Sequence, residues 1–408
     1  MNGGTFTGTD ERSIPDGPLL LDNPVRNYAW GSRTYLPALL GRQSPADEPW
    51  AEIWMGAHPD DPSGLPDGRT LADLAPDLPF LVKLLAADRP LSIQAHPDRA
   101  AAAAGFAAED ARAVPRSAPD RAYRDRNHKS ELLVPLTRVD ALCGFRPPAE
   151  ALELAAALSV PALDAAFEPL AGGDPESGWR AAFGGLVTMD ADKSRALVGQ
   201  VAAACKWISD TEAGGDERTA AVFSWVRRLA DAYPGDTGAL APIFLRLLVL
   251  APGEAVFVEP GVMHAYLRGA GVEVQTSSDN VLRGGLTAKH VNVPELMRVV
   301  RFAVTDDPRV LATPCGDDVD SYPVRTDDFA VWRVRSTGAR LRTVPTSGPA
   351  IVLCVDGWVT VGGVQLDPGR AVFCPAGSSG SSGSSDADGV VISGLGTAFV
   401  AAGGAAAG

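Results

Sequence analysis

Two polar residues that can bind a metal, Gln94 and His96, lie two positions apart in the short stretch LSIQAHPD (91–98). The stretch has the character of a β-strand, in which residues two apart point to the same face. The amide of Gln94 and the imidazole of His96 would therefore project together, into a core or into a cavity. A neutral amide beside an imidazole suits a metal ion that accepts mixed nitrogen and oxygen ligands.

Glu131 and His264 complete a candidate set of ligands. Glu131 lies in the strand-like NHKSELLVPLT (127–137), on the same face as Lys129. His264 follows the second turn of a hairpin with two PG turns (251–267), a setting typical of jelly-roll metal sites. Each residue alone would be interpreted as a core or surface residue. Two imidazoles, one carboxylate and one amide together form a mixed set that suits Zn²⁺ and similar divalent metals, with room for solvent or substrate oxygens.

The elements that must position these residues are mostly short strands. Residues 79–97 are predicted to form two strands around a turn at residues 88–90, and residues 99–113 a helix. From residue 147 to about residue 236, apolar residues recur at helical spacing, which predicts a helical insertion. Short strands that end in Gly, Pro or polar residues resume after Pro242, which suggests an antiparallel barrel or jelly roll.

A short internal repeat indicates two jelly rolls. Segments 251–267 and 367–383 share PGxAVF followed closely by Pro and Gly, but only the first copy carries a histidine after its second turn. The fold class expected is mainly β with a helical insertion. The domains expected are a catalytic, metal-binding jelly roll, a helical domain, and a degenerate jelly roll without metal, at 18–146 with 237–308, 147–236 and 309–408. The Gly/Ser-rich loop at 377–389 is not expected to carry function.

Composition limits the class of protein. The chain has 408 residues, 46% of them hydrophobic and 21% charged, as in globular proteins of two or three domains. It has 36 basic and 50 acidic residues and no basic cluster, which argues against a nucleic-acid partner. Five widely spaced cysteines, a polar acidic N-terminus and the absence of a membrane-length apolar run predict a cytoplasmic protein with reduced thiols and no membrane partner. A monomer is expected.

Seven stretches of the sequence carry a family resemblance: NYAWGS (27–32), EIWMGAHP (52–59), PFLVKLL (79–85), LSIQAHPD (91–98), NHKSEL (127–132), PGEAVFVEPGVMHAYL (252–267) and SDNVLRGGLTAKHVNVPEL (278–296). Together they resemble the type I mannose-6-phosphate isomerases, zinc-dependent enzymes of the cupin superfamily, over nearly the whole chain. The resemblance implies two cupin-type jelly-roll barrels plus an α-helical domain. It implies one zinc ion per chain, bound by Gln94, His96, Glu131 and His264.

Two departures from the family motifs affect loops. Ser130 stands where the family has the proline of N-H-K-P-E, and Ala288 stands where it has the proline of T-P-K. Both changes loosen the backbone without removing a functional group. They put the rigidity of these loops in doubt more than the activity.

The resemblance implies an aldose–ketose isomerase that interconverts D-mannose 6-phosphate and D-fructose 6-phosphate and feeds mannose and GDP-mannose metabolism. A proton moves between C1 and C2 through a cis-enediol, so a proton carrier and a positive charge facing the enediolate are needed. The family's catalytic arginine falls on Arg283, and Lys129 is a second expected cation. Glu273, Asp279 and His128 are candidates for the proton carrier. Glu273 is preferred, because the strand after the hairpin should return past the metal there.

Four residues are expected to contact the sugar phosphate. Ser92 shares a strand face with Gln94, and Lys289 is a candidate phosphate contact. Tyr266 and Trp30 complete the set, with a core position as the alternative for Trp30.

Two other classes of protein compete with this interpretation. A non-haem iron oxygenase would also use two histidines and a carboxylate on a jelly roll, but the added Gln94 and the nearby Lys and Arg argue against it. A non-catalytic sugar-phosphate-binding module is the second alternative, and the intact metal set argues against it. The motif histidine His58 is expected to have a structural role.

Overall fold

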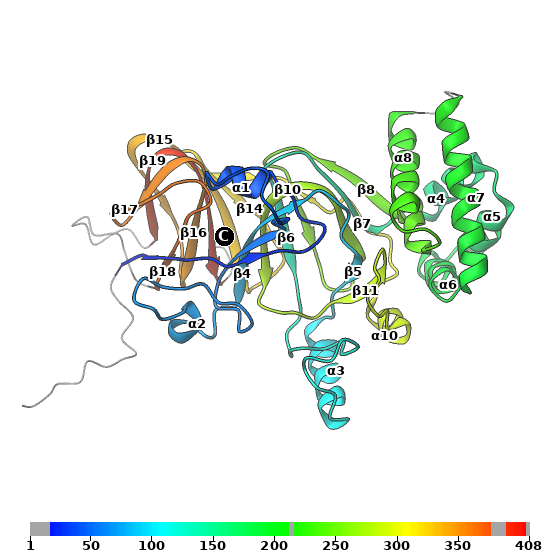
Figure 1. Cartoon of the computed structure of the whole chain (residues 1–408), viewed down its shortest axis with the longest axis horizontal. Coiled ribbons are helices and arrows are strands. Elements are labelled where there is room, and N and C mark those ends of the chain that lie inside the picture. Colours follow the sequence, from blue (N-terminus) through cyan, green and yellow to red (C-terminus); the bar gives the residue numbers. More distant parts are fainter. Residues whose placement is uncertain (1–16, 212–215, 377–388, 405–408) are drawn as a thin grey trace, which may run out of the picture.

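The structure is a computed structural model that describes residues 17–211, 216–376 and 389–404 (Figure 1). Two β regions lie side by side, and a bundle of helices lies at the end opposite the C-terminal strands (Figure 1). The expected fold class, mainly β with a helical insertion, is confirmed. The division into three domains stays a prediction. Residues 377–388, which make up most of the Gly/Ser-rich loop, lie outside the described residues.

The first β region consists of two sheets that share one long strand, β10 (His264–Thr276). The first half of β10 pairs with β5 and β7, and the second half, from Gly269, pairs with β4 and β6. At this change of partners Gly269 has φ 116°, and a side chain there would meet the carbonyl of Arg138, so the position requires glycine. One sheet holds β2 (Val25–Arg26), β3 (Glu52–Met55), β4 (Phe80–Ala87), β6 (Glu131–Pro135), β9 (Ala255–Val258) and β12 (Arg309–Val310), and the other holds β5 (Ile93–Ala95), β7 (Val139–Phe145), β8 (Leu245–Leu250) and β11 (Leu282–Gly285).

Alternation along these strands separates an inner set of side chains from an outer set. On β4, Leu85 belongs to the apolar core between the two sheets, whereas Leu84 belongs to the core shared with the C-terminal β region. Lys83, Glu131 and His264 occupy positions of the inner set next to this apolar core. The interior of the first β region is therefore apolar along most of its length and polar at one end.

The helical insertion leaves the sheet after β7 and rejoins it at β8. It comprises α4 (Pro148–Leu158), α5 (Pro161–Phe167), η1 (Glu168–Ala171), α6 (Pro175–Val187), α7 (Ala191–Asp210), α8 (Glu217–Ala232), η2 (Thr237–Leu240) and α9 (Ala241–Phe244). Asp174, Asp190 and Asp216 cap the first turns of α6, α7 and α8. Phe145 on β7 and Leu245 on β8 are register partners, so the insertion begins and ends at one place in the sheet.

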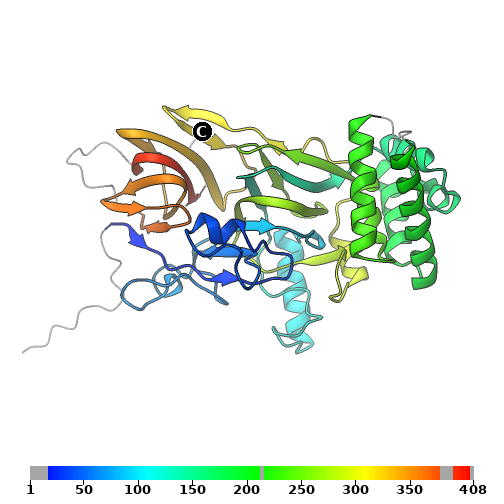
Figure 2. The same cartoon turned by 45° about the horizontal axis from the view of Figure 1, so that its top comes forward.

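The second β region is an eight-stranded sheet made of β1 (Leu19–Leu20), β13 (Thr313–Gly316), β14 (Val319–Tyr322), β15 (Phe329–Val344), β16 (Ala350–Val361), β17 (Val364–Leu366), β18 (Ala371–Cys374) and β19 (Val390–Gly403). Strand β1 pairs with β18, so the N-terminal segment crosses to the C-terminal sheet (Figure 2). Phe80 of the first region and Phe329 and Phe373 of the second share one buried core. The strand pairings among the described residues follow open paths and not a closed ring.

The remaining helices belong neither to the two β regions nor to the insertion. They are α1 (Tyr35–Leu39), α2 (Leu71–Leu74), α3 (Arg99–Ala111) and α10 (Val293–Val299). Helix α3 is the alanine-rich helix expected from the sequence, and the carboxylate of Asp98 caps it by accepting the N–H of Ala101. A search of the described residues finds no helix of the length and apolarity that a membrane crossing requires.

Candidate metal centre and active-site cavity

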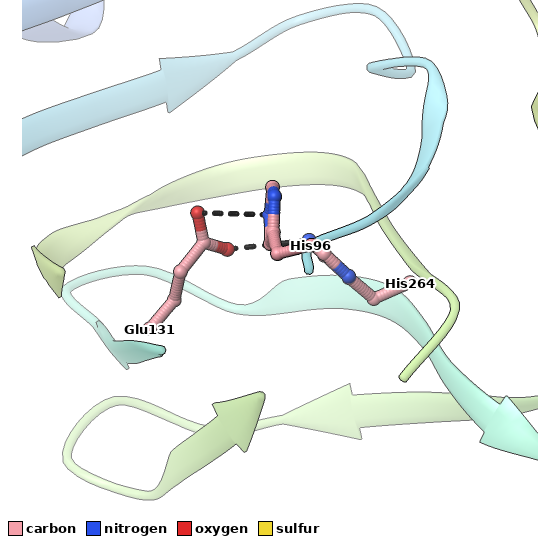
Figure 3. A group of neighbouring side chains, drawn as sticks. All are labelled: His96, Glu131 and His264. Atoms are coloured by element: carbon pink, nitrogen blue, oxygen red, sulfur yellow. Dashed lines mark ion pairs between the residues drawn. The ribbon is translucent and has the colours of Figure 1, made fainter. Parts of the chain in front are cut away.

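His96, Glu131 and His264 converge at the polar end of the first β region (Figure 3). His96 follows β5, whereas Glu131 and His264 are the first residues of β6 and β10. One carboxylate oxygen of Glu131 lies 3.3 Å from Nε2 of His96, and the other lies 3.2 Å from Nε2 of His264. All three side chains are buried. The structure therefore brings together three of the four expected ligands from segments far apart in the sequence.

The hydrogen bonds of the two imidazoles fix which nitrogen faces Glu131. Nδ1 of His96 lies 2.7 Å from the carbonyl oxygen of Asn280, and Nδ1 of His264 lies 3.1 Å from that of Val262. A carbonyl oxygen only accepts, so each Nδ1 carries the proton and a neutral ring directs the lone pair of Nε2 at the carboxylate. Nε2 of His96 is buried without a hydrogen-bond partner among the described residues. Lone pairs that converge in this way fit a bound cation, which would relieve their repulsion.

Electrostatics favour the ligand form of His96 and of Glu131. Burial, helped by the positive charge of Lys129, lowers the pKa of His96 to about 4, so its ring is neutral near pH 7. Burial works against the charge of Glu131, but Lys129, whose Nζ lies 2.9 Å from Oε1, holds the pKa of this carboxyl well below its usual range. A neutral imidazole and a carboxylate are the forms that bind a divalent metal.

Gln94 is the fourth expected ligand, and it lies in the middle of a three-strand group. On β5 it is the register partner of His264 on β10 and of Arg283 on β11. Its amide nitrogen donates to the hydroxyl of Ser92 at 3.3 Å, and its Oε1 accepts no hydrogen bond from the described part of the chain. The oxygen that a metal would use is therefore free.

A second buried cation, Lys83, lies near this group. Its Nζ is 3.1 Å from Glu273 and 3.7 Å from Glu52, and the indole N–H of Trp54 donates to Glu52 at 2.8 Å. Burial opposes the charge, but the carboxylates of Glu52 and Glu273 raise the pKa of Lys83, so it remains a cation. Sequence reasoning missed Lys83, because PFLVKLL gives no sign that its one lysine points to the polar end of the interior.

A cavity of about 560 Å³ opens beside the ligand group. Seven of the residues expected at the site line it: Trp30, Ser92, Gln94, Lys129, Asp279, Arg283 and Lys289. Lys83 and Trp54 line it as well. Trp30 stacks on Tyr28 with ring centroids 5.7 Å apart and is half-buried, so its ring packs and also borders the cavity.

Three cations without carboxylate partners gather in one part of the cavity wall: Arg124, Arg283 and Lys289. Burial lowers the pKa of both Arg283 and Lys289, and the charge of Arg124 lowers each further, as expected for like charges held close together. No ion pair involves any of the three within the residues that the structure describes. Such a group is suited to an anion with several oxygens. Arg124 was missed, because its loop is held at the site by contacts with residues far away in the sequence, such as the hydrogen bond from its N–H to Oδ1 of Asn280.

Asp279 is one of three acidic residues that line the cavity, together with Glu52 and Asp60. Its Oδ2 lies 3.2 Å from Nε2 of the buried His58. Burial would raise the pKa of Asp279, but the hydrogen bond and charge of His58 and the charges of Lys129 and Lys83 outweigh burial and lower it. Oδ1 has no hydrogen-bond partner among the described residues. The structural role expected for His58 takes the form of this contact with Asp279.

Besides the three converging ligand candidates, three of the expected site residues do not line the cavity. Glu273 is buried and paired with Lys83, and burial raises its pKa despite this pair. Nε2 of His128 lies 2.7 Å from Asp328 of the second β region. Tyr266 is part of the apolar core between the two sheets, and burial raises the pKa of its hydroxyl well above the usual range.

The second β region contributes no residue to the candidate metal groups found among the described residues. Those groups are His96, Glu131 and His264, and a more exposed set of His58, Asp60 and Asp279. The expectation that the C-terminal repeat binds no metal stays a prediction.

Comparison with known proteins places the chain in a family. Residues 19–77 and 71–148 match the model of the phosphomannose isomerase type I catalytic domain. The mannose-6-phosphate isomerase of Escherichia coli is 35% identical over 87% of this chain and 94% of its own length, and that of Homo sapiens is 31% identical over 82% and 86%. Two crystal structures of mannose 6-phosphate isomerase, an apo form from Salmonella typhimurium and a zinc-bound form, superpose with TM-scores of 0.82 at 30% identity and cover 95% of this chain and 100% of theirs. The chain therefore belongs to the mannose-6-phosphate isomerase family, the type I phosphomannose isomerases.

Proposed function

We propose that the chain is a zinc-dependent aldose–ketose isomerase that interconverts D-mannose 6-phosphate and D-fructose 6-phosphate. The observation that carries the proposal is the convergence of Nε2 of His96, Nε2 of His264 and the carboxylate of Glu131 beside a cavity whose wall also holds the unpaired cations Arg124, Arg283 and Lys289. Family membership supports the substrate. The proposal includes a monomer in the cytoplasm, a small-molecule substrate, no nucleic-acid or membrane partner, and a role in supplying GDP-mannose.

One zinc ion per chain would be held by Gln94, His96, Glu131 and His264. This set of two imidazoles, one carboxylate and one amide oxygen fits zinc, and the cavity leaves room for a substrate oxygen. When bound, zinc would supply a Lewis acid that polarises an oxygen of the substrate.

The three unpaired cations divide into two roles. Arg124 and Lys289 would bind the phosphate, an anion that is present throughout the reaction. Arg283 is the register partner of the ligand Gln94, so we assign it to the reacting carbons, where its guanidinium would stabilise the enediolate. Lys129, whose ammonium lies 2.9 Å from Glu131, would add positive charge on the same side.

Asp279 is the proton carrier that the geometry supports, in place of the earlier preference for Glu273. Asp279 lines the cavity, is ionised and has one oxygen free, whereas Glu273 is paired with Lys83 and does not reach the cavity wall. In this assignment Asp279 removes the proton from C2 of mannose 6-phosphate and returns it to C1, while the hydroxyl proton passes from O2 to O1 of the enediol, and the reverse direction uses the same steps. His58 would hold the carboxylate in place through its hydrogen bond.

The test is a coupled assay that measures fructose 6-phosphate formed from mannose 6-phosphate. Activity should vanish after chelation and return when Zn²⁺ is added. Glu131→Gln should be inactive and should not be restored by Zn²⁺, whereas Glu259→Gln, which removes a carboxylate paired with Arg301 and Arg325 at the surface, should remain active. Full activity of a demonstrably metal-free preparation would contradict the metal assignment, and an inactive zinc-loaded protein would contradict the reaction.

A further inference from the structure

We propose that Asp328, in the second β region, is a positioning residue for the metal centre of the first. Its carboxylate holds His128 and Thr276, and these two residues belong to the segments that place Glu131 and His96. Asp328, His128 and Thr276 are called the clasp below. The inference rests on the metal centre proposed above, and it gives the C-terminal β region a role in a reaction to which it contributes no ligand.

Asp328 immediately precedes β15, and its side chain is 14% exposed. Its Oδ2 lies 2.7 Å from Nε2 of His128 and accepts hydrogen bonds from the hydroxyls of Thr276 at 3.1 Å and Thr326 at 2.9 Å. Its Oδ1 lies 3.2 Å from the guanidinium of Arg99, which is mostly exposed. One oxygen therefore joins the two β regions, while the other makes a surface ion pair of little expected strength.

The first branch of the clasp runs through His128 to Glu131. In the extended segment before β6, alternate side chains point to opposite sides. Lys129 lines the cavity and Glu131 is a candidate ligand, whereas His128 points the other way, to Asp328. Nδ1 of His128 is buried without a partner among the described residues, so the pair with Asp328 is the polar attachment of this ring.

The second branch runs through Thr276 to the same segment. The hydroxyl of Thr276 donates to Asp328 and accepts the N–H of Ser130 at 3.4 Å, and the N–H of Thr276 donates to the carbonyl of Ser130 at 3.0 Å. A proline at this position, as in the family motif N-H-K-P-E, would have no N–H to donate. In this chain, hydrogen bonds with Thr276 hold the residue before Glu131 where the motif has a rigid ring.

The clasp also supports His96. Thr276 leads into residues 277–280, and the carbonyl of Asn280 accepts the proton of His96 Nδ1. The side-chain amide of Asn280 donates to the carbonyl of Asn127 at 2.8 Å, which ties this segment to the one that carries Glu131. His264 is oriented by Val262 instead. The clasp therefore bears on two of the three converging ligands.

The carboxylate of Asp328 remains charged near neutral pH. Burial would raise the pKa of Asp328, but its hydrogen bond and charge interaction with His128 and its bonds with Thr326 and Thr276 lower it to about 2. A fixed carboxylate is what a positioning role requires.

The experiment measures the rate at which zinc leaves the holoenzyme when a chromophoric chelator is added in excess. Asp328→Asn keeps the shape of the side chain but removes its charge, and Thr276→Val removes the hydroxyl alone. Loss of an outer contact of a metal site typically costs about 10–100-fold in metal affinity or activity. For both variants we expect the lower end of this range, which is about tenfold faster release of zinc. The reason is that the clasp contacts the segments that carry the ligands and not the ligands themselves. The kcat should fall as well, because the clasp positions two of the proposed zinc ligands.

Two control variants separate positioning from general destabilisation. Arg99→Ala removes the exposed ion pair on Oδ1 of the same carboxylate. Asp320→Asn breaks the pairs of a buried carboxylate with Arg333 and Arg335 within the second β region. Both should release zinc at the wild-type rate.

Three results would overturn the inference. It fails if Asp328→Asn, shown by circular dichroism to be folded, releases zinc as slowly as the wild type. It also fails if Asp320→Asn accelerates release equally, since the effect would then come from weakening the whole region. If the wild-type protein binds no zinc at all, the proposed metal centre fails, and the inference fails with it.

Discussion

Substitution of Arg283 tests which positive charges of the cavity stabilise the enediolate and which bind the phosphate. Arg283 and Lys289 both line the cavity, and neither has a carboxylate partner among the described residues. They differ in position, because Arg283 is the register partner of the ligand Gln94, whereas Lys289 lies beyond β11. In the proposed reaction, a charge beside the candidate ligands would face the enediolate, which is present only near the transition state. A charge farther along would face the phosphate, which is present from the start.

The two positions predict different kinetics. Loss of one preorganised donor to a developing negative charge lowers kcat by about 10²–10³, or roughly 2.7–4 kcal/mol of barrier. Arg283→Ala should therefore lose this factor in kcat with little change in KM. A hydrogen bond to a charged group contributes about 1.5–3 kcal/mol, so Lys289→Ala and Arg124→Ala should raise KM roughly tenfold to a hundredfold and spare kcat.

The assay measures initial rates over a range of mannose 6-phosphate concentrations that reaches saturation for every variant. Arg283→Lys should recover only part of kcat, since an ammonium cannot reproduce the fork of the guanidinium. Arg99→Ala, at an exposed arginine away from the cavity, is the matched control and should behave as wild type. A normal kcat for Arg283→Ala at saturating substrate would refute the reasoning and make Arg283 a phosphate-binding residue.

Four further outcomes follow from the same structure. Elemental analysis should find about one zinc ion per chain in the wild-type protein and almost none in Glu131→Gln. A wild-type zinc content in that variant would remove Glu131 from the ligand set. Asp279→Asn should lower kcat by about 10²–10⁴-fold, which is the usual contribution of a general base, and should leave the zinc content unchanged. A variant with full kcat would exclude Asp279 as the proton carrier. The pKa of His96 is about 4 in the folded protein, below its ordinary value, so the metal-free unfolded chain takes up the proton first as the pH falls. The free energy of unfolding of the chelated protein should therefore drop by at most about 3 kcal/mol from pH 6.5 to 4. Urea denaturation measures this drop, which should be smaller for His96→Asn. An equal drop for the variant and the wild type would contradict the assigned pKa. Shortening the loop at 377–385 should leave kcat nearly unchanged, and a loss of about tenfold, or 1.4 kcal/mol of barrier, with the fold intact would show that this loop reaches the site.

The convergence of His96 and His264 could be predicted in part from local signals. The strand-like spacing of Gln94 and His96 and the turn before His264 are both visible over a short range of sequence. Glu273 shows the limit of this reasoning. The strand does return past the ligand group as expected, but the register sets Glu273 opposite Lys83 and makes the two an ion pair. Register between strands far apart in the sequence depends on the whole sheet, which no local pattern contains.

The residues that were missed lie on segments without a pattern of their own. Arg124 reaches the cavity because Asn280, distant in sequence, accepts two backbone N–H groups of its loop. Asp328 contacts His128 only because the second β region packs on the first. Such contacts are consequences of tertiary packing, so they become visible only when the elements are assembled. The helical insertion, in contrast, followed directly from its apolar periodicity.

Because Phe145 and Leu245 are paired, the whole helical insertion occupies the place of a hairpin loop between β7 and β8. The 99 residues from 146 to 244 lie between them. Each doubling of loop length costs only about 0.6 kcal/mol of closure entropy, so growth from a two-residue turn to this length costs roughly 3 kcal/mol. Burying two large apolar side chains recovers a cost of that size, at about 1.5–3 kcal/mol each. Closing the hairpin therefore sets almost no limit on the length of this segment, so residues can be added or removed there while β7 and β8 keep their register.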